Sequence, residues 1–201
     1  MKFPLLPLAL EYCQGQGLEI GGAAHNPYGV NALNIQPVDG YEWHVTEQRK
    51  LGNEPLSVDI WAEGDQLPVD DSSQDFVLAS HVIEHMPDAI RAILEWFRVI
   101  RAGGCIFLVI PQRDALESDK HRPLTTLAHC QADYRCRMTV KDHPIADGHA
   151  VRGHYHVWDL DRFLELVYYV RNRYAHNLAI LETQDPDQKV GNGFAVVLGK
   201  S

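Results

Sequence analysis

Short apolar runs alternate with helical patterns along this chain. The runs predict strands at Gly17–Gly21, Ala32–Ile35, Leu56–Ile60, Phe76–Ser80, Cys105–Ile110, Leu178–Glu182 and Phe194–Leu198. Strands separated by helical patterns are typical of an α/β fold built on a mostly parallel sheet.

The clearest helix is predicted from about Asp88 to Arg101, because Asp88 is a candidate N-cap and apolar residues recur at the spacing of one helix face. Those apolar residues are Ile90, Ile93, Leu94, Phe97 and Ile100. The pair Gly103-Gly104 is expected to end this helix. A second helix is predicted from roughly Asp159 to Arg171, with the same spacing at Leu160, Phe163, Leu164, Val167 and Val170.

Helical and strand periodicity both fail between Pro111 and Trp158, where the chain is polar and rich in histidine. Of the eleven histidines, six lie between His121 and His156. The length of 201 residues favours one domain. We therefore predict a single domain, residues 1–201, with a histidine-rich insertion at about 112–157 that lies over one end of the sheet as a lid.

Charge and cysteine usage narrow the function classes. The formal net charge is −9, and such a chain repels a phosphate backbone, so no nucleic-acid partner is expected. The four cysteines lack CxxC pairing and zinc-ligand spacing, which favours a reducing compartment. The apolar N-terminus is interrupted by Pro4 and Pro7, and no other stretch approaches the length of a membrane span. A cytoplasmic protein without a membrane span is the expectation.

An acidic residue and a glycine pair follow each other at the end of the first predicted strand, as Glu19, Gly21 and Gly22. Ligands of open parallel sheets bind outside the carboxyl ends of the strands, where glycines allow close approach to the backbone. The dinucleotide fingerprint G-x-G-x-x-G is missing, and Glu19 would repel a pyrophosphate. Taken alone, the segment fits either a ligand-binding loop or a tight turn.

More specific signals lie in the middle of the chain, where Leu67-Pro68, Ser80-His-Val-Ile-Glu-His85 and Gly103-Gly104 follow in order. With the segments around them, they resemble the central motifs of class I S-adenosylmethionine-dependent methyltransferases, from about Leu18 to Pro111. The resemblance implies a Rossmann-like, seven-stranded, mostly parallel sheet with helices on both faces and the last strand antiparallel. It also implies S-adenosylmethionine as cofactor.

The resemblance assigns a set of residues to the amino acid end, ribose, adenine and sulfonium of the cofactor. They are Glu19, Gly21, Gly22, Ala23, Gln36, Glu63, Gly64, Ser80 and His81. An acidic pocket suits a ligand that carries a sulfonium and an ammonium group.

Three features depart from the family pattern. Ala23 replaces the second glycine of E/D-x-G-x-G, and Gln36 stands where an acidic residue usually binds the ribose hydroxyls, unless Asp39 takes that role. Glutamine bonds a hydroxyl without charge assistance. Only about ten residues separate the first two strands, fewer than the usual long helix needs.

Two histidine patterns bear on metal binding. His81, Glu84 and His85 have the spacing of one helix face, and some members of the wider superfamily hold magnesium there with a glutamate in the first position. Imidazole is a poor magnesium ligand, and we expect no metal. His129 and Asp133, four residues apart, fit either a helical metal pair or a hydrogen-bonded surface pair.

The candidate catalytic residues are His85, His121 and His154, because imidazole has an unperturbed pKa of about 6.5 and can accept a proton near neutral pH. The expected reaction is displacement of the sulfonium methyl group by an oxygen or nitrogen of a small molecule, such as a metabolite, a sugar or a lipid-linked intermediate. Two alternatives remain open. Ala23 and Gln36 suggest a degenerate, methyltransferase-like binding protein, and the histidines suggest a metal-dependent hydrolase.

Overall fold

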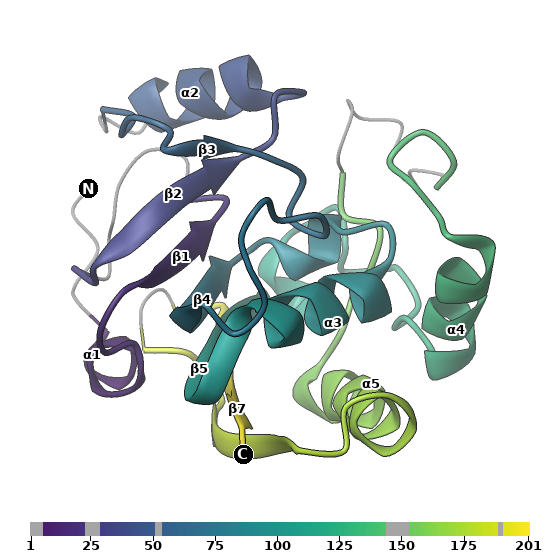
Figure 1. The fold of residues 1–201 in the computed structure, drawn as a ribbon. Helices are drawn as coiled ribbons and strands as arrows, with labels where there is room; N and C mark the ends of the chain where they lie inside the picture. Colours follow the sequence, from purple (N-terminus) through teal and green to yellow (C-terminus); the bar gives the residue numbers. More distant parts are fainter. Residues whose placement is uncertain (1–5, 23–28, 51–53, 144–152, 189–190) are drawn as a thin grey trace.

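A single seven-stranded sheet runs through the computed structural model, which describes residues 6–22, 29–50, 54–143, 153–188 and 191–201 (Figure 1). The strand order is β3 (Ile60–Trp61), β2 (Ala32–Gln36), β1 (Gly17–Ile20), β4 (Gln74–Ser80), β5 (Ile100–Pro111), β7 (Gly193–Lys200) and β6 (Leu178–Gln184). Strand β7 is antiparallel to both of its neighbours, and the other strand pairs are parallel. The predicted Rossmann-like sheet with an antiparallel last strand is therefore confirmed.

Helices cover both faces of this sheet. On one face lie α3 (Ala89–Val99), α4 (Leu127–Cys136) and α5 (Leu160–Arg173), while α1 (Pro7–Tyr12) lies on the other and α2 (Tyr41–Lys50) lies beside β3 (Figure 1). Short 3-10 turns follow β4 at Ile83–His85 and β5 at Arg113–Ala115. Among the described residues, no helix is long and apolar enough to cross a membrane.

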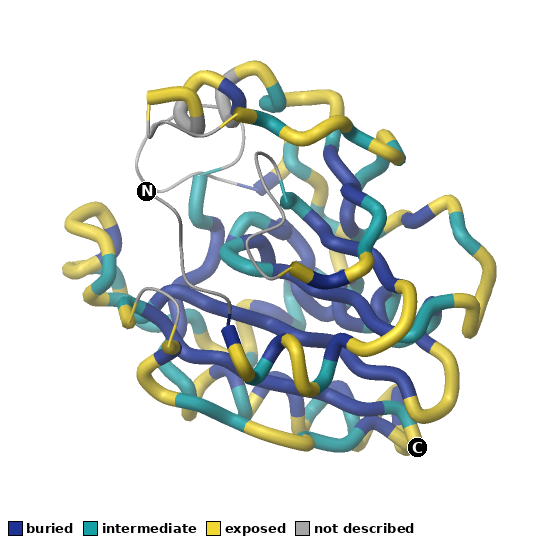
Figure 2. The backbone as a smooth tube through the Cα atoms, turned by 90° about the vertical axis from the view of Figure 1, so that its left-hand side faces the viewer, coloured by how far each residue is buried: buried dark blue, intermediate teal, exposed yellow. Residues whose placement is uncertain are grey.

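The central strands are buried on both faces, as the dark tube in Figure 2 shows. Alternate side chains of β4 enter different cores: Val77 and Ala79 pack in the core that contains α3 and α5, while Phe76 and Leu78 pack in the core that contains α1. Strands covered on both faces read as continuous apolar runs, which is why the sequence revealed them.

Both predicted helices are confirmed, together with the predicted N-cap Asp88, and Asp159 caps the second helix in the same way. The Asp88 side chain accepts a hydrogen bond from Arg91 N at 2.9 Å, and the Asp159 side chain accepts one from Arg162 N at 2.9 Å. Each cap satisfies a backbone donor that the first helical turn leaves without an intrahelical partner.

Two sequence predictions are corrected. Gly103-Gly104 does not end α3, which stops at Val99; instead Gly103, with φ of +78°, lies in an irregularity near the start of β5. The predicted strand Leu56–Ile60 is reduced to Ile60–Trp61. The residues before Ile60 are held by Asn34, whose side-chain amide donates to Ser57 O and whose backbone N donates to the Asp59 carboxylate.

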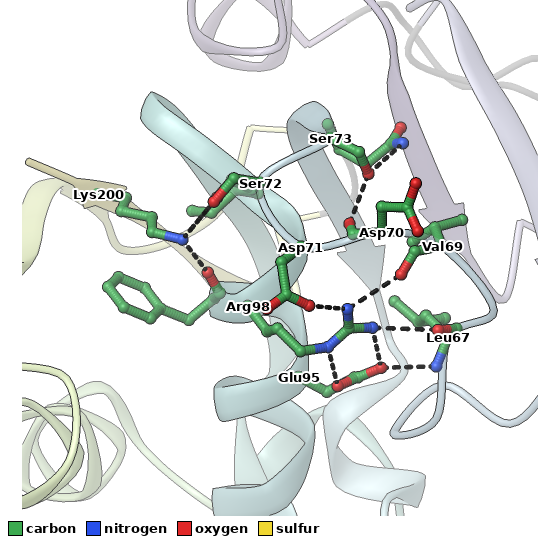
Figure 3. Close-up of polar contacts among 12 residues, drawn as sticks. Leu67, Val69, Asp70, Asp71, Ser72, Ser73, Glu95, Arg98 and Lys200 are labelled. Carbon is green, nitrogen blue, oxygen red and sulfur yellow. Dashed lines mark hydrogen bonds and ion pairs between the residues drawn. The ribbon is translucent and has the colours of Figure 1, made fainter.

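The loop between β3 and β4 is fixed to α3 by the guanidinium of Arg98 (Figure 3). Arg98 donates to Leu67 O at 3.1 Å and Val69 O at 2.9 Å, and its charge is paired with Glu95 at 2.7 Å and Asp71 at 2.6 Å. Glu95 in turn accepts a hydrogen bond from Leu67 N at 2.7 Å. These contacts hold Leu67, Val69 and Asp71 of the loop against α3.

We expect Arg98→Ala to lower the free energy of unfolding by about 2 kcal/mol, because Glu95 and two loop carbonyls lose a charged donor. Chemical denaturation followed by circular dichroism measures this change. The matched control is Arg162→Ala, because Arg162 also pairs with a glutamate three residues away, at 2.9 Å, but both side chains are about half exposed. Such a pair contributes about 0.5 kcal/mol. Equal losses in the two variants would contradict a role for Arg98 in holding the loop.

Candidate active site

A cleft opens at the carboxyl ends of β1, β2 and β4, and its lining includes Gly21, Gln36, Gly64, His81 and His85. Strand β1 has β2 on one side and β4 on the other, so the strand order reverses direction at this point. Open α/β sheets bind their ligands at such a switch point. The cleft therefore joins residues that the sequence analysis assigned to the cofactor and to catalysis.

Backbone geometry at the end of β1 requires glycine. Gly21 has φ of +70°, and a Cβ there would lie 2.7 Å from Val82 Cγ2. A Cβ at Gly22 would lie 2.9 Å from the carboxyl carbon of Glu19 and 3.1 Å from Asn34 Oδ1. Glu19 is buried beside Gly22 and is not among the described residues that line the cleft. Ala23 lies outside the described residues.

Gln36, the last residue of β2, is buried and donates its side-chain amide to Asn34 Oδ1 at 3.0 Å. This bond orients the Gln36 side chain at the cleft. Asp39, the alternative ribose ligand, lines a neighbouring hollow together with Glu63.

Gly64 brings the loop after β3 against β1. A Cβ there would lie 3.0 Å from Ile20 Cγ2 and 3.1 Å from Met86 Cε. Its carbonyl accepts a hydrogen bond from Trp96 Nε1 of α3 at 2.8 Å. The backbone of this loop is therefore held where it lines the cleft.

The turn after β4 begins at His81, which follows Ser80 and has φ of +55°. A positive φ is uncommon for a residue with a side chain. His81 N donates to Val109 O at 2.8 Å, which holds this backbone conformation at the mouth of the cleft.

Glu84 forms the centre of a group of histidines, which we call the Glu84 cluster: Glu84, His81, His85 and His154. Glu84 is 1% exposed, and its Oε1 lies 3.8 Å from His81 Nδ1, 3.9 Å from His85 Nε2 and 4.0 Å from His154 Nε2. Neither carboxylate oxygen accepts a hydrogen bond from the described residues. Burial raises the pKa of Glu84 to about 8, and the nearby Asp119 adds to the rise, so Glu84 is mostly protonated at pH 7.

Two histidines of this cluster are oriented through Nδ1. His154 Nδ1 lies 2.5 Å from Asp119 Oδ2, and Asp119 is itself paired with Arg122 at 2.7 Å. His85 Nδ1 lies 3.1 Å from Gly153 O, and the two rings are 4.6 Å apart between centroids. Because Nδ1 donates to an oxygen in each case, the proton is on Nδ1 and the lone pair is on Nε2.

The structure brings two of the three predicted bases together. His85 lines the cleft and His154 lies beside it, whereas His121 is exposed and makes no contact with either one within the described part of the chain. Asp119 was not predicted as a site residue. It is 35 positions from His154, and no periodicity links the two segments.

A second group, which we call the His129 cluster, contains His129, Asp133, His143 and His156. Burial lowers the pKa of His156 well below its usual range, and His129 and His143 add to this effect. The pair His129 and Asp133 is thus part of a larger arrangement whose other two residues the sequence analysis did not select.

Comparison with known proteins places this geometry in context. Residues 15–108 match the family described as "Methyltransferase domain". This match spans β1 to most of β5, slightly less than half of the chain. An uncharacterized methyltransferase of Mycobacteroides abscessus is 34% identical to it over 98 residues, 45% of this chain and 38% of the relative. The 27-O-demethylrifamycin SV methyltransferase of Amycolatopsis mediterranei is 38% identical over 66 residues, 31% of this chain and 24% of the relative.

The chain thus spans less than two fifths of the length of these relatives. A crystal structure of a SAM-dependent methyltransferase from Methanosarcina mazei has the same fold, with a TM-score of 0.55 at 17% identity over 98% of both chains. The family match and the name of this structural neighbour agree with S-adenosylmethionine, the cofactor that the sequence analysis expects.

The residues around the cleft fit this cofactor. Glycine at positions 21, 22 and 64 keeps the backbone open where a Cβ would meet neighbouring atoms within about 3 Å. Gln36 adds a polar side chain to the lining of the cleft, whereas Glu19 is buried beside Gly22.

Proposed function

We propose that this protein is an S-adenosylmethionine-dependent methyltransferase that methylates an oxygen or nitrogen atom of a small molecule. The observation that carries the proposal is the Glu84 cluster beside the cleft. Its member His154 pairs with Asp119 and adjoins His85, which lines the cleft. A binding protein without transfer activity has no need of an oriented base at this place.

The proposal assigns separate residues to each part of the cofactor. Glu19 and the Gly21-Gly22 turn would hold the amino acid end of the cofactor, Gln36 the ribose, Glu63 and Gly64 the adenine, and Ser80 and His81 the region of the sulfonium. When bound, the cofactor supplies a methyl group on a positively charged sulfur, whose thioether leaves without protonation. The protein therefore has to align the acceptor and, where the acceptor is a hydroxyl, remove its proton.

The Asp119–His154 pair is suited to that proton transfer. The Asp119 carboxylate accepts a hydrogen bond from the Nδ1–H of His154. This bond orients the ring and stabilises the imidazolium that forms when Nε2 takes a proton. Protonated Glu84 can donate a hydrogen bond within the same cluster. His85 lines the cleft and would contact the acceptor directly.

Three observations support a small-molecule acceptor. The net charge of −9 disfavours large anionic polymers. The relative from Amycolatopsis mediterranei is named for methylation of a rifamycin at an oxygen. The proposed base also lies in a buried part of the site. Only 13% of the His154 side chain is exposed, and the neighbouring Glu84 is 1% exposed.

Cofactor binding is tested by calorimetric titration of S-adenosylmethionine into the wild-type chain and Glu19→Gln. We expect Glu19→Gln to weaken binding about 10–100-fold, because a charge-assisted contact to the ammonium contributes about 1.5–3 kcal/mol. Glu117→Gln is the matched control, because it removes the same charge from a side chain that is 84% exposed. Equal affinity in wild type and Glu19→Gln would remove Glu19 from the cofactor site.

Transfer itself is tested with S-adenosylmethionine labelled in the methyl group and a metabolite extract freed of protein and nucleic acid. We expect label to enter organic products of the small-molecule fraction. Binding of the cofactor without any transfer would favour the degenerate binding protein. Label that enters only a parallel protein or nucleic-acid fraction would contradict the proposed acceptor class.

A further inference from the structure

The His129 cluster draws its members from three separate segments. Helix α4 supplies His129 and Asp133, which are four residues apart and therefore share a face. His143 lies in the turns after α4, and His156 lies in the segment that leads to α5. Asp133, His143 and His156 are all more than nine-tenths buried.

Four ligand atoms of these side chains converge on one point. His129 Nε2 lies 3.3 Å from His143 Nε2 and 3.2 Å from Asp133 Oδ2, and Asp133 Oδ2 lies 3.6 Å from His143 Nε2 and 4.0 Å from His156 Nε2. All four atoms lie within 4.8 Å of one another. Zinc bonds of about 2.0–2.1 Å in a tetrahedron place ligand atoms about 3.3–3.4 Å apart.

Two members of this cluster, Asp133 and His156, carry buried polar atoms that no described residue satisfies. Asp133 Oδ2 and His156 Nε2 both lack a hydrogen-bond partner among the described residues, although both atoms are buried. His129 and His143 also present nitrogen to nitrogen, so at least one of the two facing atoms lacks a proton. A buried carboxylate oxygen without a donor is costly, and a cation bound between Asp133 Oδ2 and His156 Nε2 would satisfy both atoms.

We propose that His129, Asp133, His143 and His156 form a zinc site that is separate from the methyl-transfer site. Three imidazoles and one carboxylate suit zinc, whereas magnesium and calcium prefer oxygen ligands. Four protein ligands leave no open coordination position, which is typical of a structural site. The sequence analysis expected no metal, since imidazole is a poor magnesium ligand, and left His129 and Asp133 open as a metal pair or a hydrogen-bonded pair.

The site has a direct connection to the Glu84 cluster. Tyr155 N and His156 N both donate to Glu84 O, at 2.8 and 3.2 Å, and His154 is two residues from the proposed ligand His156. Zinc would therefore fix the segment that carries His154. This consequence for His154 rests on the proposed function, but zinc binding does not.

The test is the metal content of protein purified without chelators or histidine tags, measured by elemental analysis. We expect one zinc per chain in wild type and in the control His176→Ala, which removes an exposed histidine between α5 and β6. His129→Ala should lose the metal, and it should still fold because the His129 side chain is 44% exposed. His156→Ala is a second test at the most buried ligand.

Folding is checked separately by stripping zinc with a chelator and adding it back. Zinc should restore the thermal midpoint of wild type and His176→Ala but leave that of His129→Ala unchanged. The affinity for zinc should be lower in His129→Ala than in wild type. The decrease should exceed the roughly 10–100-fold that is typical when a residue next to a metal ligand is lost. Stripped wild type that fails to bind added zinc, or equal affinity in His129→Ala and His176→Ala, would overturn the site. Neither measurement needs the cofactor or an acceptor, so failure here leaves the methyltransferase proposal standing.

Discussion

His154→Ala should lower the rate of methyl transfer by about 10²–10⁴-fold, the usual contribution of a positioned general base. The loss should appear in kcat, and the affinity for S-adenosylmethionine should stay unchanged, because the proposed role of His154 is to take a proton from the acceptor and not to hold the cofactor. Transfer of labelled methyl groups to the small-molecule fraction measures the first quantity, and calorimetry measures the second.

Asp119→Asn tests whether Asp119 positions His154. Asparagine keeps the size of the side chain but loses the carboxylate that accepts the Nδ1 proton at 2.5 Å. We expect a fall in kcat in the same direction, an unchanged KM for the cofactor, and partial rescue in Asp119→Glu. The control for both variants is the exposed His176→Ala. If His154→Ala retained wild-type kcat, the assignment of the base would be wrong.

A further control separates this prediction from the zinc site. His154 makes no contact with the His129 cluster in the described residues, so His154→Ala should keep its full zinc content. Loss of both zinc and turnover in His154→Ala would mean that the variant acts through the fold of the 153–157 segment and not through proton transfer.

The sheet could be predicted from sequence because its central strands are covered on both faces. Phe76 to Ala79 are almost completely buried, and such strands read as uninterrupted apolar runs. The cap Asp88 was equally visible, since it acts within three residues of itself. The cofactor loops followed from a resemblance in local motifs.

The acceptor side could not be predicted in the same way, because polar contacts between distant segments define it. Helix α4 escaped detection since its buried positions include Asp133 as well as Cys130, so no apolar stripe marks it. The pairing of Asp119 with His154 and of Asp133 with His156 depends on how the segment before α5 packs against residues that lie far from it in the sequence. Residue types indicated chemistry in this region, but only the fold shows which residues meet.

Trp96→Ala should lower the free energy of unfolding by about 3–5 kcal/mol, because it removes one of the two buried tryptophans of the α3 core and leaves a cavity. Denaturation followed by circular dichroism measures the change. Trp61→Ala is the control, since Trp61 is 50% exposed and its described ring contact is one edge-on pair with Tyr41. That pair contributes about 1 kcal/mol. Equal losses in the two variants would contradict the central place of Trp96 in the core.

Trp96→Phe separates packing from the hydrogen bond to the cleft. Phenylalanine retains most of the apolar contacts but cannot donate to Gly64 O, which Trp96 Nε1 reaches at 2.8 Å. The carbonyl that is left without its donor costs about 1–3 kcal/mol. Because Gly64 lines the cleft, we also expect weaker binding of S-adenosylmethionine in Trp96→Phe than in wild type, measured below the denaturation midpoint. Unchanged cofactor affinity together with reduced stability would mean that the Gly64 loop keeps its position through Arg98 and α3 alone.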